Sequence, residues 1–319
     1  MQKHGLRTGF LEYIENPAKV SFPWSMIDKI TPRPDASVKK MLEDAGFTDT
    51  ESIVTSKNTY VAPFVNAEEA QYLVIENAFP NGRPALENAG VMFTSRETVE
   101  KVERMKVCTC LNPLHTALAV YGCLLGYTKI SDEMKDADLV KLVEIIGYKE
   151  GLPVVTDPGI LSPKKFIDEV LQIRVPNPFM PDTPQRIACD TSQKLSIRFG
   201  ETIKEYMASS ELDVKSLKFI PMVQAGWCRY LLGVDDELNA FTVSPDPMYE
   251  ELAGKLAGVK VGESCDVHAV LSPILSDAKI FGVNLYEAGL GEYVESIFAE
   301  LIAGKGAVRE TLKRHLAEA

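Results

Sequence analysis

The sequence predicts an α+β fold in which a small mixed α/β domain (1–95) precedes a mostly α-helical domain (96–319). Two observations support this. Up to about residue 95, short strand-like stretches alternate with a helix and with turns rich in proline and glycine. Beyond that point apolar residues recur with the helical period. With 319 residues, 45% of them hydrophobic, the chain is long enough to bury a core in each domain.

In the first domain we expect one helix and two strands. The segment SVKKMLEDAGF (37–47) has the helical period, with Ser37 as a plausible N-cap and Gly46 as a plausible stop. β-Branched and aromatic residues favour strands around 59–64 and 71–75.

In the second domain we expect a succession of helices. They are 97–105, 113–127, 133–147, 163–173, 184–190, 192–208, 213–232, 247–257, 266–275, 284–303 and 306–317. The stretch 107–128 carries no charged residue and is as long as a membrane span. It contains polar groups that are costly in lipid, so a buried helix is the better interpretation, and we expect no membrane partner.

Composition argues against several classes of protein. The 34 Lys and Arg against 45 Asp and Glu give a net charge of -11, which does not suit a nucleic-acid binder. Six cysteines in so long a chain indicate neither a disulfide framework nor a zinc site. The first twenty residues hold no apolar run of signal-peptide length, so we expect a cytoplasmic protein with reduced thiols.

The segment 103–127 embeds Lys106, Asn112 and His115 in apolar surroundings. Pro113 favours Asn112 as the N-cap of the next helix. A lysine against an apolar wall can have its pKa lowered and act as a general base, with the amide and imidazole holding the reacting oxygen. The alternative is that Asn112 only caps the helix, that His115 is a satisfied core residue and that Lys106 extends to water.

The segment 174–203 combines a helix start with the densest group of basic side chains. Asp182 or Thr183, followed by a proline, is a strong N-terminal signal. Basic and acidic residues then recur at every fourth position, on one face if the helix is continuous. These are Arg186, Asp190 and Lys194. With Arg174 and Arg198 they suit a polyhydroxylated or anionic ligand. The alternative is a surface helix with ion pairs between successive turns.

Two further observations concern ligands. Asp28 ends an apolar stretch and can orient a ligand or a lysine, although a lone carboxylate there is more often a turn former. No G-x-G-x-x-G follows a strand and no Walker-type loop occurs, so the sequence carries no recognisable dinucleotide fingerprint.

Four motifs between residues 21 and 194 together resemble the mannitol dehydrogenase family of long-chain polyol dehydrogenases, which includes fructuronate and tagaturonate reductases. Two of them are SFPWSMIDKITP (21–32) and FPNGRPALENAGV (79–91). The third is E-x-x-K followed by L-N-x-x-H, formed by Glu103, Lys106, Leu111, Asn112 and His115. The fourth is formed by Asn177, Pro178, Asp182, Arg186, Asp190, Ser192 and Lys194.

The resemblance implies metal-free hydride transfer between C2 of an open-chain hexonate or hexitol and the nicotinamide of NAD or NADP. Lys106 would be the general base, Asn112 would stabilise the developing alkoxide and His115 would position the substrate. Glu103 would lie on the proton route to solvent.

The resemblance also implies binding roles. Arg186 and Lys194, with Asn177 and Asp190, would bind the far hydroxyls or carboxylate of the sugar. Asp28 would bind the cofactor.

Two departures from the family pattern stand out. The family usually has four residues between its lysine and asparagine, whereas here there are five, and a bulge would have to absorb the extra one. Family members usually begin with a nucleotide-binding domain that carries a Gly-rich loop. We therefore expect residues 1–95 to be the trailing, Rossmann-type remnant of such a domain.

This remnant leaves the source of the nucleotide-binding domain open. Adjoining sequence would supply it, or a partner chain would supply it in trans, which requires an exposed apolar face on 1–95. The alternative function is a non-catalytic helical module that binds sugar acids or a partner.

Overall fold

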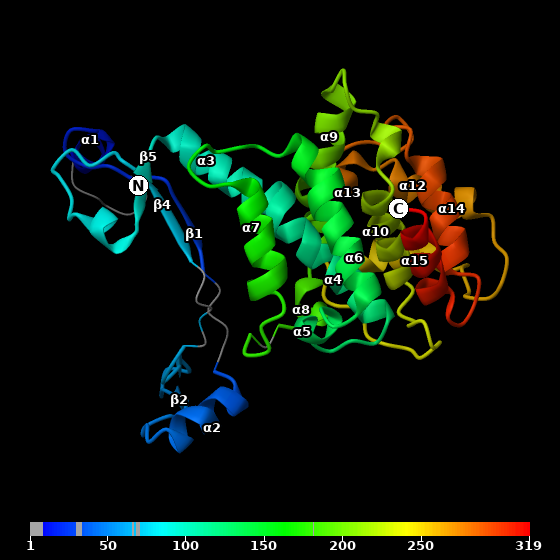
Figure 1. The fold of residues 1–319 in the computed structure, drawn as a ribbon, viewed down its shortest axis with the longest axis horizontal. Helices are drawn as coiled ribbons and strands as arrows, with labels where there is room; N and C mark the ends of the chain where they lie inside the picture. Colours follow the sequence, from blue (N-terminus) through cyan, green and yellow to red (C-terminus); the bar gives the residue numbers. More distant parts are fainter. Residues whose placement is uncertain (1–8, 30–33, 66, 68–70, 181) are drawn as a thin grey trace.

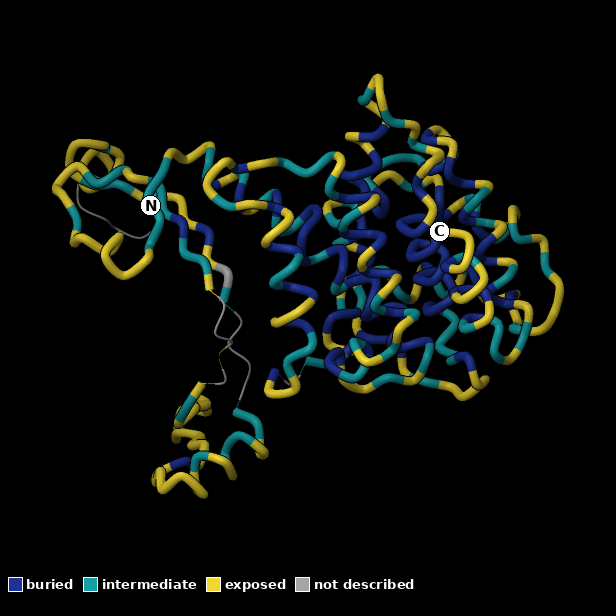
Figure 2. The backbone as a smooth tube through the Cα atoms, in the orientation of Figure 1, coloured by how far each residue is buried: buried dark blue, intermediate teal, exposed yellow. Residues whose placement is uncertain are grey.

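The computed structural model describes residues 9–29, 34–65, 67, 71–180 and 182–319 (Figure 1). It confirms the α+β class, because a helical body follows a smaller part that holds all the named strands of the described chain. Figure 2 shows that buried backbone is concentrated in the helical body, whereas the smaller part is largely exposed.

The smaller part is built around a three-stranded sheet with the order β1-β4-β5. β1 (Ser25–Asp28) pairs antiparallel with β4 (Tyr72–Glu76), which pairs parallel with β5 (Met92–Thr94). A separate hairpin joins β2 (Ile53–Val54) to β3 (Tyr60–Val61). The remaining elements are α1 (Phe10–Glu15), α2 (Ala36–Asp44) and the short 3₁₀ turn η2 (Leu86–Ala89).

The helical body contains α-helices interrupted by four π-helical turns among its described residues. Its first half runs α3 (Arg96–Met105), η3 (Lys106–Cys110, π), α4 (Asn112–Leu124), α5 (Ile130–Glu133), α6 (Ala137–Glu144), η4 (Ile145–Gly151, π), η5 (Leu152–Val154), α7 (Pro163–Glu169) and η6 (Val170–Arg174, π). Its second half runs α8 (Pro184–Ile187), η7 (Thr191–Gln193), η8 (Ser196–Gly200, π), α9 (Glu201–Ala208), η9 (Val214–Ser216), α10 (Phe219–Tyr230), α11 (Tyr249–Leu256), α12 (Val267–Leu275), α13 (Ala278–Phe281), α14 (Gly291–Leu301) and α15 (Ala307–Ala317).

The centre of the body is formed by α4 and α10, which are buried almost all round. They approach closely because Gly226 of α10 faces Tyr121 of α4, where an added Cβ would lie 3.1 Å from the ring. The Tyr121 hydroxyl donates to the carbonyl of Met222 at 3.2 Å. The continuous stretch Arg96–Leu124 is long and apolar enough to cross a membrane, but 83% of its most apolar window is buried inside the body. The prediction of a buried helix at this position is confirmed.

Two expected helix caps were wrong, whereas one expected helix stop is confirmed. Asp35, not Ser37, caps α2, because its carboxylate accepts from the Ser37 and Val38 amides at 2.8 and 3.4 Å. Asn112 is the first residue of α4 and its side chain does not cap the helix. The stop at Gly46 is confirmed, since this glycine follows α2 with φ of 90°.

The expected helices 184–190 and 192–208 are also broken. α8 ends at Ile187, and Asp190 takes a left-handed conformation with φ of 51°. The next stretch is a 3₁₀ turn, a π turn and only then α9. In this region polar side chains and backbone amides form hydrogen bonds with groups outside a helix, and these bonds outweigh the helical spacing of the apolar residues.

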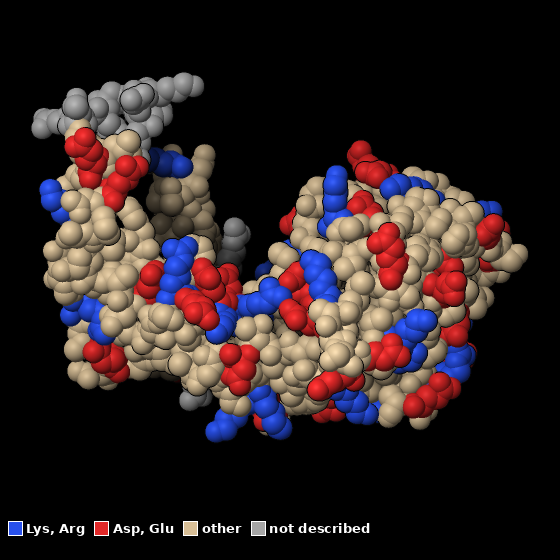
Figure 3. All heavy atoms as spheres, turned by 90° about the horizontal axis from the view of Figure 1, so that it is seen from above, with Lys and Arg blue, Asp and Glu red and all other residues tan. Residues whose placement is uncertain are grey.

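Charges of both signs are interspersed over the face drawn in Figure 3, which also shows a hollow between the smaller part and the helical body.

Candidate active site

The three residues expected to carry the chemistry lie on one helical stretch with a π turn in its middle. α3 ends at Met105, the π turn starts at Lys106, and α4 starts at Asn112 after Leu111, whose φ is -131°. A π turn holds one residue more than an α turn. It therefore absorbs the extra residue between Lys106 and Asn112, as a bulge was expected to do.

The π turn is held in place by a second π turn. An added Cβ on Gly151, at the end of η4, would lie 2.8 Å from the Thr109 methyl group and 3.0 Å from the carbonyl oxygen of Ile146. The absence of a side chain at Gly151 thus lets η4 pack directly against the turn that follows Lys106.

His115 is half-buried and faces a cavity of about 20 Å³, enough for one water molecule, which needs about 10–15 Å³. The cavity is lined by Leu111, His115, Ile130, Arg174, Val175, Met180 and Asp182. Burial lowers the pKa of His115 to about 4, and the positive charges of Arg174, Arg198 and Arg186 lower it further, against the carboxylate of Asp182. The imidazole is therefore neutral near pH 7 and can position a hydroxyl group without carrying charge.

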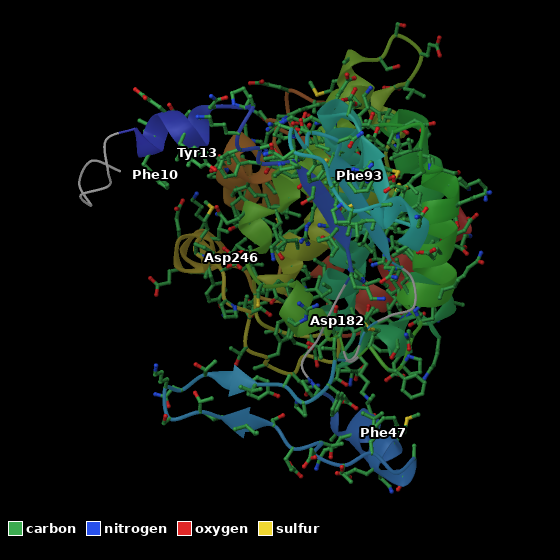
Figure 4. All side chains as sticks on the ribbon, turned by 90° about the vertical axis from the view of Figure 1, so that its left-hand side faces the viewer. Phe10, Tyr13, Phe47, Phe93, Asp182 and Asp246 are labelled. Atoms are coloured by element: carbon green, nitrogen blue, oxygen red, sulfur yellow. The ribbon has the colours of Figure 1, made fainter. Side chains whose placement is uncertain are left out.

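Arg186 lies beside this cavity in a two-pronged ion pair. Its Nε and Nη2 donate to the two oxygens of Asp182 at 2.6 and 2.5 Å. Asp182 is labelled in Figure 4, above the β2–β3 hairpin in that view. The guanidinium predicted to bind substrate is thus already neutralised by a carboxylate of its own segment.

Lys194 and Asp190 do not share a helix face with Arg186, because α8 ends at Ile187. The expectation of one continuous face was wrong. The Lys194 ammonium donates to the carbonyl of Cys189 at 2.5 Å, and burial together with Arg198 lowers its pKa. Asp190 is exposed, and its backbone amide donates to the carbonyl of Pro245 at 2.9 Å.

The three remaining predicted residues lie in separate parts of the structure. Asn177 is half-buried, and its Oδ1 accepts from the Phe179 amide at 3.0 Å in a local turn. Glu103 is exposed on α3, one turn before the half-buried Lys106. Asp28 is the last residue of β1, but its side chain lies outside the described part of the structure.

Sequence reasoning missed one polar contact that anchors this region. The Ser192 amide and hydroxyl donate to the two oxygens of Asp246 at 2.8 and 2.6 Å. Asp246, labelled in Figure 4, is 54 residues further along the chain, and no local pattern marks it as a partner. The contact fixes the backbone between Asp190 and Lys194.

The residues described by the structure do not fit the pyrophosphate of a dinucleotide. The one parallel strand pair, β4 with β5, is joined by FPNGRP and η2 rather than by a Gly-rich turn that opens a long helix. Within the same described ranges, no group of three His, Cys, Asp or Glu side chains could hold a metal ion.

Comparison with known proteins identifies the relatives of this site. The sequence profile of the mannitol dehydrogenase C-terminal domain matches residues 98–297, which include the proposed base and all the predicted sugar-binding positions. The chain belongs to the mannitol dehydrogenase family. It is 59% identical over 308 residues to the D-mannonate oxidoreductase of Thermotoga maritima, covering 95% of this chain and 56% of the relative. It is 31% identical over 272 residues to the mannitol 2-dehydrogenase of Aspergillus niger, covering 82% of this chain and 51% of the relative.

Solved structures of this family have the same fold. The mannitol 2-dehydrogenase of Pseudomonas fluorescens, solved with NAD and D-mannitol, superposes with a TM-score of 0.72 at 26% identity, covering 97% of this chain and 56% of that one. A D-sorbitol dehydrogenase in substrate-free form superposes with a TM-score of 0.74 at 26% identity, covering 93% and 55%. The chain spans about half the length of the relatives it matches.

Proposed function

We propose that this chain is the catalytic, substrate-binding half of an NAD- or NADP-dependent dehydrogenase that interconverts a sugar acid or polyol and its 2-keto form. The favoured pair is fructuronate and mannonate, with fructose and mannitol next. The observation that carries the proposal is the grouping of Lys106, Asn112 and His115 on one largely buried stretch, where His115 faces a cavity whose polar lining also includes Arg174 and Asp182. The 59% identity with a D-mannonate oxidoreductase supports the choice of a sugar acid.

The proposed chemistry of this chain is proton transfer and stabilisation of an oxyanion. Lys106 takes the hydroxyl proton of C2 when the alcohol is oxidised and returns it when the ketone is reduced. The Asn112 amide donates to the developing alkoxide, and the neutral His115 imidazole holds the substrate hydroxyl. Glu103, exposed one turn earlier on α3, carries the proton toward solvent. The nicotinamide cofactor, when bound, accepts or supplies the hydride.

The sugar-binding roles of Arg186, Lys194, Asn177 and Asp190 remain part of the proposal. For Arg186 this role requires one of two changes. Either the ion pair with Asp182 opens, or both side chains turn toward the ligand together.

We further propose that a nucleotide-binding domain, from adjoining sequence or from a partner chain, completes the cofactor site on the Asp28 side. Large apolar side chains are exposed along the smaller part of the structure, as this arrangement requires. They include Phe10, Leu11, Tyr13, Phe22, Trp24, Ile27, Met41, Phe47, Ile53, Val54 and Leu86. Figure 4 shows Phe10 and Tyr13 together on α1, well apart from Phe47 near α2.

The first test is NADH consumption with fructuronate, tagaturonate and fructose, measured on the purified chain alone and on the chain supplied with a nucleotide-binding domain. We expect turnover to be fastest with fructuronate and to fall at least about 100-fold in Lys106→Ala, because a positioned general base contributes that much. Lys101→Ala is the matched control, since Lys101 lies on the same helix in an exposed ion pair with Glu97.

An unchanged rate in Lys106→Ala would overturn the assignment of the base. A folded wild-type chain that binds fructuronate but shows no turnover even when a nucleotide-binding domain is supplied would favour the sugar-acid-binding alternative.

A further inference from the structure

Arg198 forms no ion pair with an acidic side chain of the described chain. It lies on the π turn Ser196–Gly200 and is half-buried. Its Nη1 donates to the hydroxyl of Thr116 at 2.7 Å, and burial lowers the pKa of Arg198 to about 10. A guanidinium withdrawn from water without a counter-charge is costly unless an anion completes the site.

The neighbouring cations have partners of their own. Arg186 is paired with Asp182, and the Lys194 ammonium donates to a backbone carbonyl. Arg104, on α3, is paired with both Glu201 and Glu205. These side chains have therefore already committed hydrogen-bond donors to protein groups. The guanidinium of Arg198 keeps donors that can bind a ligand.

Arg198 also lies between the two halves of the candidate site. Thr116, which it contacts, directly follows His115 on α4, and Lys194 precedes Arg198 by four residues. Its backbone amide donates to the carbonyl of Lys194 at 2.9 Å, so Arg198 contacts both the residue after His115 and Lys194 itself. A ligand that spans from His115 to Lys194 passes this guanidinium.

We propose that Arg198 binds the carboxylate of the sugar acid and so determines the preference for a hexonate over a neutral hexitol. The inference rests on the proposed function, since it concerns a ligand of the same site. The planar fork of a guanidinium matches a carboxylate with two parallel hydrogen bonds, whereas a terminal alcohol of a hexitol accepts only one and carries no charge. The Thr116 hydroxyl accepts from Nη1 and so helps to hold the fork in place.

The test compares the dissociation constants of D-mannonate and D-mannitol, measured by calorimetry on the full chain. For Arg198→Gln we expect mannonate binding to weaken by at least about tenfold, because a hydrogen bond to a charged group contributes about that much. Mannitol binding should change by less than about threefold. Arg198→Lys, which keeps the charge but loses the fork, should recover part of the mannonate affinity.

Two further variants separate ligand binding from a structural role. Thr116→Val removes the hydrogen bond that braces Arg198 but keeps the guanidinium, so the preference for mannonate should persist. Arg104→Gln removes an arginine whose ion pairs lie on a neighbouring surface and should leave both affinities unchanged.

The outcomes distinguish this inference from the proposed function. Equal weakening of mannonate and mannitol in Arg198→Gln would overturn the specificity role and assign Arg198 to bracing α4, while leaving the proposed function intact. A folded wild-type chain that bound neither ligand would overturn the proposed function and this inference with it.

Discussion

Glu133 and Glu150 are both buried in the helical body, but their carboxyl groups have opposite surroundings. Neither oxygen of Glu133 has a hydrogen-bond partner within the described chain. Burial raises its pKa to about 9, with Asp136 and Asp182 adding to the shift. The oxygens of Glu150 instead accept from the amides of Lys218, Phe219 and Ile220 at 2.7, 2.8 and 2.7 Å, where α10 begins.

Glu133→Gln is expected to stabilise the protein at neutral and alkaline pH. In the folded protein the pKa of Glu133 is about 9, so its carboxyl group stays protonated up to about that pH, whereas in the unfolded chain the same group ionises near pH 4.5. The free energy of unfolding therefore falls as the pH rises between these two values. At pH 7.5 the variant should gain up to about 4 kcal/mol, and this gain should vanish below pH 4.5. Urea unfolding at pH 4.5 and 7.5 measures the difference, and a gain that did not depend on pH would contradict the explanation.

Glu150→Gln is the matched comparison and should have the opposite sign. The amide nitrogen of glutamine would face an N–H donor of α10, so the variant should lose about 1.5–3 kcal/mol. The two substitutions make the same chemical change, and only the hydrogen-bond partners differ.

The sequence suggests which residues form the candidate site, but it predicts few of their contacts. Lys106, Asn112 and His115 were identified from spacing and resemblance, and the extra residue before Asn112 led us to expect the bulge that the π turn provides. The pairing of Ser192 with Asp246 could not be predicted, because it joins segments 54 residues apart. The Arg186–Asp182 ion pair could have been predicted from its i,i+4 spacing. Only the structure shows that this pair engages the guanidinium that was expected to bind the ligand.

At the scale of elements, the π turns are the feature that helical periodicity did not reveal. Such a turn keeps the hydrophobic pattern of a helix while adding one residue, so the sequence read 192–208 as a single helix. Close packing accompanies the turns. Gly200, which ends η8, lies against the backbone of α13, where an added Cβ would be 2.1 Å from the carbonyl oxygen of Phe281.

Gly200→Ala is therefore expected to destabilise the protein by about 3 kcal/mol or more, because a backbone carbonyl cannot move aside as a flexible side chain can. Gly254→Ala in α11 is the matched control. Nothing lies within 4 Å of an added Cβ there, so alanine should stabilise the protein by about 0.5–1 kcal/mol through its better helix propensity. Chemical unfolding of the two variants measures both effects. A neutral Gly200→Ala would show that η8 and α13 are not packed as closely as described.

At the scale of the whole molecule, the two parts contribute unequally to the core. In the described chain, Met26 and Val74 are the buried hydrophobic residues before Val99, and all others belong to the helical body. The parts also meet through Tyr72, whose hydroxyl donates to Glu169 at 2.9 Å and whose ring lies 5.2 Å from that of Phe166. The core of the helical body is thus nearly complete without the smaller part.

A chain consisting of residues 95–319 is accordingly expected to fold as a cooperative unit. It keeps Ser95, whose hydroxyl accepts from the Thr98 amide and caps α3. It loses the aromatic pair and hydrogen bond of Tyr72, the cation–π contact of Arg96 with the Trp24 ring at 4.7 Å, and the packing of Met26 and Val74 against the core. Together these contribute about 5–10 kcal/mol, so Tm should fall by about 10–30 °C for a domain of this size. Thermal unfolding followed by circular dichroism measures the change. A truncated chain without a cooperative transition would show that the sheet is part of the folding unit, and the exposed apolar side chains of the smaller part would then be the open edge of one domain rather than a surface that another domain covers.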